Sequence, residues 1–167
     1  IGRANRFFLN FCEKIICYAN NISSFPDKFQ NKLEISPPFI RKNYYEINNN
    51  KDVDKIFTII IIGGSQGAQV FDEIIHESIL KISNLRPLKI IHQTNQKNIN
   101  FLKNFYSENK IENIIFNFEK NLNKLLVQAD LCITRAGAST LAEISLLKIP
   151  FIAIPLPSSK DNHQSKN

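Results

Sequence analysis

The chain has 167 residues, of which 43% are hydrophobic and 22% charged, and it carries a formal net charge of +6. This length allows one domain with a hydrophobic core and excludes two full-sized domains. No apolar run approaches the roughly 18 to 20 residues that a membrane-spanning helix needs. The three cysteines lack the paired spacing of a metal site, so neither a disulfide framework nor a zinc centre is expected. Basic residues are spread along the chain without an arginine cluster, which predicts a solvated basic surface and no nucleic-acid partner.

The two ends of the sequence are unlike those of a complete translation product. The chain contains no methionine and begins with Ile1. Residues 1–19 have neither the apolar core nor the small-residue cleavage site of a signal peptide, and the chain ends at Asn167, where a helix is expected to begin. We therefore expect a fragment of a longer protein that works in a reducing, cytoplasmic setting.

The first 40 residues differ in pattern from the rest of the chain. The expected elements are a helix over 3–11, strands over 14–18 and 33–35, and a loop over most of 20–38. Such a segment is too short to form a domain and is interpreted as the last piece of a preceding one. The polar run 42–54 is interpreted as a linker or surface excursion.

From residue 56 onward, apolar runs of strand length alternate with segments of helical period. Strands are expected over 56–62, 88–92, 114–118, 131–134 and 151–154. One helix is expected to span the apolar positions from 70 to 82, with further helices around 99–106, 122–126 and 141–147. This alternation is typical of repeated βαβ units, so the sequence predicts an α/β fold with a Rossmann-like parallel sheet and flanking helices.

The sequence GGSQGA at 63–68 directly follows the strongest predicted strand and precedes a helix. A glycine-rich turn at the carboxyl end of a strand lets backbone amides approach a phosphate, and the helix N-terminus adds a partial positive charge. Ser65 and Gln66 would add side-chain donors. The alternative is a tight turn that uses glycine only for its backbone freedom.

A second strand-to-helix junction, TRAGASTLAE at 134–143, repeats this arrangement. Gly137 permits close approach, Ser139 and Thr140 can cap the helix or contact an anion, and the Glu143 carboxylate can accept two sugar hydroxyls. The alternative is that Ser139 or Thr140 only caps the helix and Glu143 only complements its dipole. Two such junctions on one sheet edge favour a diphosphate ligand.

A third polar segment, residues 155–164, follows the last predicted strand. Asp161 can cap a following helix, which would leave Asn162, His163 and Gln164 as exposed donors near the same sheet edge. No histidine is paired with a nucleophile at a convincing spacing, and no metal-ligand cluster is present. The sequence therefore predicts no catalytic residue in this chain.

Taken together, segments 63–68, 135–143 and 161–164 resemble, in order and spacing, the nucleotide-sugar-binding domain of the MurG family of bacterial glycosyltransferases. Residues 1–6 are similar to the end of the family's N-terminal domain. Ile40 and Arg41 are similar to the close of its interdomain Gly-Asn-Pro-Val-Arg segment, although the preceding residues are Pro-Pro-Phe here.

The resemblance implies a GT-B fold, in which two Rossmann-like domains face each other across a cleft. Residues 1–40 would be the tail end of the N-terminal, acceptor-binding domain. Residues 41–167 would be an incomplete C-terminal UDP-sugar-binding domain. The catalytic residues and the acceptor site would belong to the missing N-terminal part, so this chain alone is expected to be inactive.

The resemblance further implies an inverting N-acetylglucosaminyltransferase of peptidoglycan biosynthesis that needs no cofactor and no metal. Its expected partners are UDP-N-acetylglucosamine, the undecaprenyl-linked muramyl-pentapeptide acceptor and, through the missing N-terminal domain, an anionic membrane surface. Its expected location is peripheral, at the cytoplasmic face of the bacterial inner membrane. The alternatives are another GT-B enzyme, such as a lipid glycosyltransferase or a nucleotide-sugar epimerase, and a non-catalytic nucleotide-sugar-binding subunit of a split transferase.

Residue by residue, the resemblance implies that Ser65 meets the diphosphate, Glu143 the ribose hydroxyls and Gln164 the N-acetylglucosamine hydroxyls. The backbone near Phe118 and Glu119 would read the uracil edge, with Leu122 beside it. Arg41 would lie at the cleft. The full expected substrate-binding set is Arg41, Ser65, Gln66, Glu119, Ala138, Ser139, Thr140, Leu141, Ala142, Glu143 and Gln164.

Overall fold

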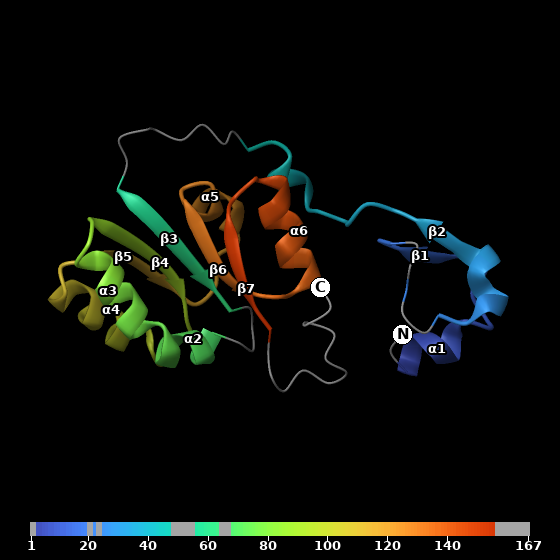
Figure 1. Cartoon of the computed structure of the whole chain (residues 1–167), viewed down its shortest axis with the longest axis horizontal. Coiled ribbons are helices and arrows are strands. Elements are labelled where there is room, and N and C mark those ends of the chain that lie inside the picture. Colours follow the sequence, from blue (N-terminus) through green and yellow to red (C-terminus); the bar gives the residue numbers. More distant parts are fainter. Residues whose placement is uncertain (1–2, 20–21, 23–24, 48–55, 64–67, 156–167) are drawn as a thin grey trace. The chain divides into compact units, whose positions relative to one another are not determined.

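The computed structural model describes residues 3–19, 22, 25–47, 56–63 and 68–155 (Figure 1). The chain divides into two compact units, Ile1–Phe39 and Ile40–Asn167. Among the described residues, no helix combines the length and the apolar character needed to cross a bilayer.

Unit 1 contains a helix, two short strands and a 3-10 helix. These are α1 (Arg3–Phe8), β1 (Ile15–Cys17), η1 (Asp27–Lys32) and β2 (Leu33–Ile35). The strands β1 and β2 pair in parallel, and Leu9, Phe25 and Phe29 form a small core. Both predicted strands are confirmed, whereas the predicted helix ends three residues early and the predicted loop contains η1.

Unit 2 is built on five strands. Its elements are η2 (Lys42–Tyr44), β3 (Phe57–Ile62), α2 (Ala68–Ile74), α3 (His76–Ser83), β4 (Leu88–Gln93), α4 (Ile99–Glu108), β5 (Glu112–Phe116), α5 (Leu122–Leu126), β6 (Leu131–Arg135), α6 (Ala138–Leu146) and β7 (Phe151–Ile154). All the strands run parallel, in the order β5-β4-β3-β6-β7. The predicted parallel α/β sheet is confirmed.

The central strand β3 is buried on both faces, as its continuous β-branched run predicts. Ile59 and Ile61 belong to the core beneath α2, α3 and α4. Ile60 and Ile62 belong to the core beneath α5 and α6. Successive side chains of a strand point to opposite faces, so this one strand joins the two cores, and the helices cover both faces of the sheet (Figure 1).

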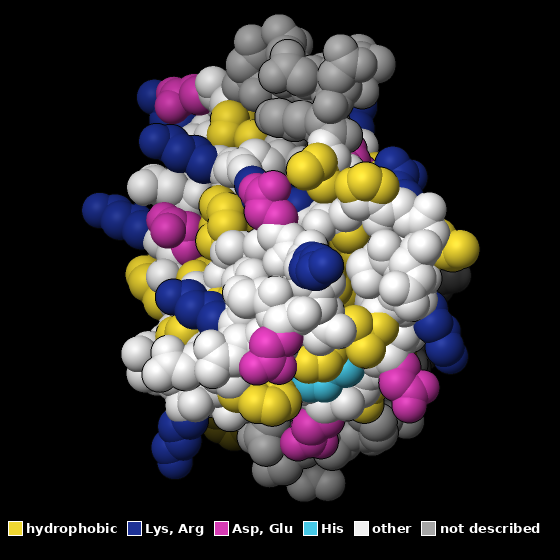
Figure 2. Space-filling model, turned by 90° about the vertical axis from the view of Figure 1, so that its left-hand side faces the viewer, with side chains coloured by type: hydrophobic (Ala, Val, Ile, Leu, Met, Phe, Trp, Pro, Cys, Tyr) yellow, Lys and Arg dark blue, Asp and Glu magenta, His cyan; other side chains and the backbone are white. Residues whose placement is uncertain are grey.

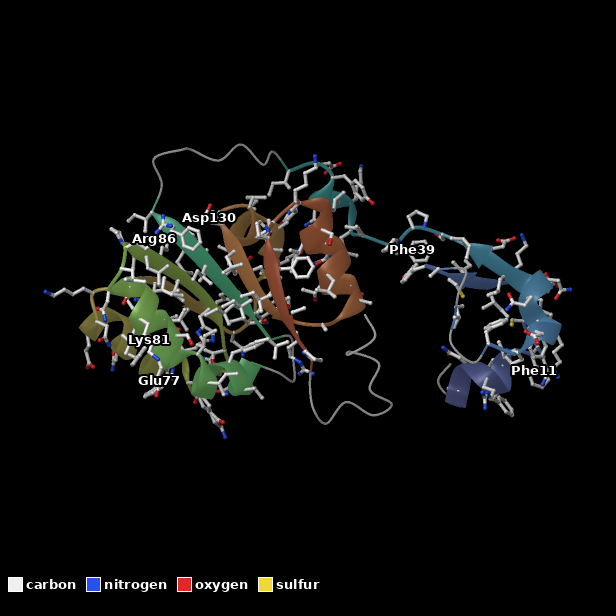
Figure 3. The ribbon with its side chains drawn as sticks, in the orientation of Figure 1. Phe11, Phe39, Glu77, Lys81, Arg86 and Asp130 are labelled. Atoms are coloured by element: carbon white, nitrogen blue, oxygen red, sulfur yellow. The ribbon has the colours of Figure 1, made fainter. Side chains whose placement is uncertain are left out.

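The amino end of β3 is fixed by polar and ring contacts (Figure 3). Asp130 Oδ2 accepts a hydrogen bond from the Thr58 backbone N–H at 2.8 Å, and the Asp130 N–H donates to the Thr58 carbonyl at 2.8 Å. The Arg86 guanidinium lies 4.3 Å from the centre of the Phe57 ring. These contacts tie β3 to the start of β6 and to the turn before β4.

Three sequence predictions need correction. The single helix over 70–82 is two helices, α2 and α3, separated at Ile75. The apolar period continues through the break because both helices face the same core. The strand expected over 114–118 is β5, two residues earlier, because an edge strand tolerates polar residues such as Glu112, which pairs with Lys89 at 2.7 Å. The polar run from residue 42 begins with η2, in which Tyr44 is 2% exposed.

A buried polar cluster joins α2 to the end of β4 and to α4. Asp72 Oδ2 accepts hydrogen bonds from Thr94 Oγ1 at 2.6 Å and from Asn98 Nδ2 at 2.7 Å. Asp72 Oδ1 lies 3.3 Å from His92 Nε2. On the other side of the imidazole ring, His92 Nδ1 lies 2.9 Å from the Tyr106 hydroxyl. The cluster thus anchors α2, the helix that follows the glycine-rich sequence.

Two groups in this region predict a stability that falls in acid. Burial, aided by nearby His92, lowers the pKa of His76 below 6.5. Burial alone would raise the pKa of Asp72, but the donors His92, Thr94 and Asn98 outweigh it and lower that pKa below 3.8. In both cases the unfolded chain takes up the proton more readily, so the free energy of unfolding falls as pH drops through 6.5 and again below 3.8.

Urea unfolding over a pH series from 8 to 3 would measure this profile. The variant His76→Gln should flatten the decline between about pH 7 and 5, where an ordinary histidine titrates, and should leave the acid decline in place. A free energy of unfolding that rises as the pH falls through this range would contradict the prediction.

The end of unit 2 that carries α3 and α4 has a mixed surface. Figure 2 shows lysine and arginine side chains interspersed with acidic ones and with apolar side chains on this face. On α3, Lys81 and Glu77 lie 4.0 Å apart on adjacent turns (Figure 3). Among the described side chains of this face, positive charge is not concentrated in one patch.

Candidate functional site

The strand order places a switch point between β3 and β6. From β3 the chain moves outward to β4 and β5, and then returns to the other side for β6 and β7. Open α/β sheets bind ligands at the carboxyl ends of the strands where the order reverses. Ile62, the last residue of β3, pairs in register with Thr134 of β6. The two strands that precede the predicted junctions, β3 and β6, are therefore neighbours in the sheet.

The second junction is described in full. Gly137 is the N-cap of α6, without a side-chain cap hydrogen bond, and the helix runs through Leu146. The predicted binding residues Ala138, Ser139, Thr140, Leu141 and Ala142 make up its beginning. The alternative in which Ser139 or Thr140 caps the helix does not match this geometry, because both lie inside the first turn. The backbone N–H groups of that turn have no partner within the helix and can meet an anion.

Glu143 lies one turn further along α6 and is paired with Arg41. Arg41 Nε donates to Glu143 Oε1 at 2.9 Å, and Arg41 Nη2 donates to Oε2 at 3.1 Å. The Glu143 side chain is 12% exposed and that of Arg41 is 54% exposed. The hydrogen bond to Glu143 raises the pKa of Arg41, against the effect of its burial. The two residues that the sequence places near the nucleotide are therefore in direct contact.

Tyr44 lies against this ion pair and was not predicted as a site residue. Arg41 Nη2 donates a hydrogen bond to the Tyr44 hydroxyl at 2.7 Å, and the guanidinium carbon is 4.9 Å from the centre of the tyrosine ring. Burial, reinforced by the charge of Glu143, raises the pKa of Tyr44. The signal that could have found Tyr44 is its apolar spacing with Ile40 and Ile47, which pack on the same core.

The remaining predicted residues lie elsewhere or outside the description. Glu119 follows the edge strand β5, and its Oε1 accepts a hydrogen bond from the Asn121 backbone N–H at 2.7 Å. Phe118 beside it is 79% exposed. Leu122 starts α5 and packs on the core beneath it. The predicted residues that fall outside the described ranges are Ser65, Gln66, Asp161, Asn162, His163 and Gln164.

The described chemistry at this edge suits binding. It consists of the Glu143 carboxylate, the Arg41 guanidinium, the Tyr44 phenol, the first turn of α6 and, at the end of β6, the Arg135 side chain. Cys132 in β6 is not a nucleophile candidate, because burial raises the pKa of its thiol to about 12. Within the described part of the chain, no group of three or more histidine, cysteine, aspartate and glutamate side chains is arranged to hold a metal ion.

Comparisons with known proteins agree on one family. The model described as "Glycosyltransferase family 28 C-terminal domain" matches residues 58–167. A protein of Pelagibacter ubique (strain HTCC1062) named "UDP-N-acetylglucosamine--N-acetylmuramyl-(pentapeptide) pyrophosphoryl-undecaprenol N-acetylglucosamine transferase" is 47% identical over 168 residues, which cover 100% of this chain and 47% of that protein. A protein of the same name from Rickettsia bellii (strain RML369-C) is 37% identical, covering 100% of this chain and 49% of that protein. This chain thus spans about half the length of the curated relatives it matches.

Two solved structures share the fold. The crystal structure of Acinetobacter baumannii MurG matches with a TM-score of 0.75 at 24% identity, covering 98% of this chain and 45% of that one. The glycotransferase of kitacinnamycin matches with a TM-score of 0.54 at 13% identity, covering 80% of this chain and 33% of that one. The fold class predicted from the sequence, a Rossmann-like sheet of the GT-B type, is confirmed.

Proposed function

Because this chain belongs to the glycosyltransferase family 28 C-terminal domain family, we propose that it is the donor-binding part of an N-acetylglucosaminyltransferase. The reaction moves N-acetylglucosamine from UDP to the lipid-linked muramyl-pentapeptide precursor of peptidoglycan. The names of its relatives from Pelagibacter ubique and Rickettsia bellii support this substrate pair. The observation that carries the proposal is the Glu143 carboxylate, held by Arg41 on the helix that follows the switch-point strand β6.

In this proposal, different residues bind the diphosphate, the ribose, the uracil and the sugar of the nucleotide. The first turn of α6 offers backbone N–H groups and the positive end of the helix dipole to the diphosphate. Glu143, one turn further, accepts the ribose hydroxyls. Ser65 and Gln66 of the glycine-rich sequence complete the diphosphate site, Glu119 lies toward the uracil, and Gln164 contacts the sugar. These last assignments are supported by the family motifs alone.

During transfer, the bond between the sugar C1 and the phosphate oxygen breaks as the acceptor hydroxyl oxygen bonds to C1 from the opposite face. Negative charge then accumulates on the departing UDP, where the dipole of α6 stabilises it. The proton of the acceptor hydroxyl requires a base within hydrogen-bond reach. We assign no residue of this chain to that role and place the base in the part of the enzyme that precedes residue 1. No cofactor is part of this proposal.

The same proposal covers the domains and the location. Residues 1–40 are the end of the acceptor-binding domain, and residues 41–167 belong to the donor-binding domain. A lipid-linked acceptor requires a protein that works at a membrane surface, so we place the enzyme peripherally at the cytoplasmic face of the inner membrane. Contact with anionic lipid belongs to the acceptor-binding domain. No nucleic-acid partner is proposed.

Calorimetric titration of the chain with UDP, UDP-N-acetylglucosamine, UDP-glucose and ADP tests the function. We expect uridine diphosphates to bind, N-acetylglucosamine to be preferred over glucose, and ADP to bind more weakly. Equal affinity for ADP and UDP would overturn the uridine assignment. A preference for glucose would favour another enzyme of the same fold. The kitacinnamycin glycotransferase shares this fold, so the fold alone does not distinguish the two functions.

A further inference from the structure

Building on the donor site proposed above, we propose that Arg41 and Tyr44 are positioning residues that fix the Glu143 carboxylate in the orientation that accepts the ribose hydroxyls. In this arrangement Arg41 acts on the nucleotide through Glu143. Tyr44 acts through its hydrogen bond with Arg41 and through its own contact with Glu143. Tyr44 belongs to the run 42–54, which the sequence pattern assigned to a linker or surface excursion, whereas Arg41 was expected at the cleft.

The geometry of the ion pair leaves Glu143 able to bind a ligand. A carboxylate has about four lone-pair sites on its two oxygens. Arg41 uses one site on each oxygen, through Nε at 2.9 Å and Nη2 at 3.1 Å. The Tyr44 hydroxyl lies within hydrogen-bonding reach of the same carboxylate, and the lone pairs that remain can accept a ligand hydroxyl. A bidentate guanidinium also fixes the plane of the carboxylate, which a point charge such as lysine would not do.

Tyr44 is a second contact of the Arg41 guanidinium. Tyr44 is 2% exposed, so its ring is held by the core beneath α5 and α6. Its hydroxyl accepts a hydrogen bond from the same Nη2 atom that binds Glu143, and its ring lies 4.9 Å from the guanidinium carbon. A phenylalanine at position 44 would fill the same space in the core but would lack the hydroxyl that accepts the hydrogen bond from Arg41. Arg41 itself is 54% exposed and depends on these contacts for a fixed position.

The segment that carries both residues is attached to two helices. The Asn43 carbonyl accepts a hydrogen bond from Asn123 Nδ2 of α5 at 2.8 Å, and Asn123 is 5% exposed. Arg41 makes the attachment to α6. An ion pair with one half-exposed partner contributes little to stability, so this arrangement is better explained by the orientation of Glu143 than by holding the fold together.

Two ligands separate positioning from other roles, because 2′,3′-dideoxy-UDP lacks the hydroxyls that Glu143 accepts. Affinities of the whole chain for UDP and for the dideoxy analogue are measured by calorimetry. For Arg41→Lys we expect the preference for UDP to fall about five- to tenfold, the scale of one or two lost hydrogen bonds. For Tyr44→Phe we expect a smaller fall of about two- to fivefold. The affinity for the dideoxy analogue should stay within about twofold of the original in both variants.

Lys42→Gln is the matched control, because Lys42 lies in the same turn, is 89% exposed and pairs with Glu46, which is also exposed. It should change neither affinity. Equal weakening of both ligands in Arg41→Lys would overturn the inference in favour of a direct contact with the diphosphate. Unchanged preference in Arg41→Lys and Tyr44→Phe would overturn it in favour of a purely structural bridge.

The proposed function fails differently. If the unaltered chain binds neither ligand, or if Glu143→Gln leaves the preference for UDP intact, the donor site itself is wrong and the inference falls with it. If Glu143→Gln abolishes the preference while Arg41→Lys and Tyr44→Phe preserve it, only the positioning role is wrong. Melting curves of all variants identify any loss of affinity that comes from unfolding.

Discussion

Replacing Asp72 with alanine is expected to lower the free energy of unfolding by about 3–5 kcal/mol, because two donors in a largely buried region lose their acceptor at a cost of about 1–3 kcal/mol each. The carboxylate is 3% exposed and accepts two short hydrogen bonds, from Thr94 at 2.6 Å and from Asn98 at 2.7 Å. Without it the Thr94 hydroxyl and the Asn98 amide lose their acceptor, and His92 Nε2 loses the carboxylate that lies 3.3 Å away. The methyl group left behind fills little of the space.

Urea unfolding at neutral pH would measure this loss. Glu77→Ala is the matched control, because this acidic residue lies on the next helix, is 89% exposed and is only 4.0 Å from a single lysine. Its effect should stay within about 0.5 kcal/mol. A similar small effect for Asp72→Ala would show that the cluster contributes little to the fold.

Replacing Glu143 with alanine is expected to weaken UDP binding by about 1–3 kcal/mol, the cost of losing hydrogen bonds to a charged group. Stability should change by only about 0–1 kcal/mol, because the partner Arg41 is half exposed and can be solvated when the carboxylate is removed. The effect thus falls on binding rather than on folding.

Calorimetry with UDP and a melting curve for the same protein distinguish the two roles of Glu143. Ser145→Ala is the control, since Ser145 is exposed on the same helix two positions further along. It should alter neither measurement. A Glu143→Ala protein with normal UDP affinity and a lowered melting temperature would favour a structural role for the carboxylate, such as a partner of the helix dipole.

The hydrophobic pattern was sufficient to predict the parallel sheet and the position of its strand-to-helix junctions. The apolar run over 57–62 predicts a strand that is buried on both faces. A half-exposed strand would alternate apolar and polar side chains, and this run does not. Alternation of such runs with helical periods implies parallel strands, and parallel strands put the residues after β3 and after β6 at one edge. The local pattern and the family motif therefore predict Glu143 as a site residue, and the binding measurements above test this prediction.

The contacts between side chains that are distant in the sequence could not be predicted from the local pattern and are known only from the three-dimensional structure. The break between α2 and α3 at Ile75 does not interrupt the helical spacing of apolar residues, because both helices pack on the same core. Arg41 and Glu143 are 102 positions apart in the sequence. Tyr44 belongs to a polar run, and its burial depends on packing against α5 and α6. The buried partners of Asp72 likewise come from other elements. Local pattern records which face of an element is apolar, but hydrogen bonds and ion pairs between distant segments form only when packing brings them together.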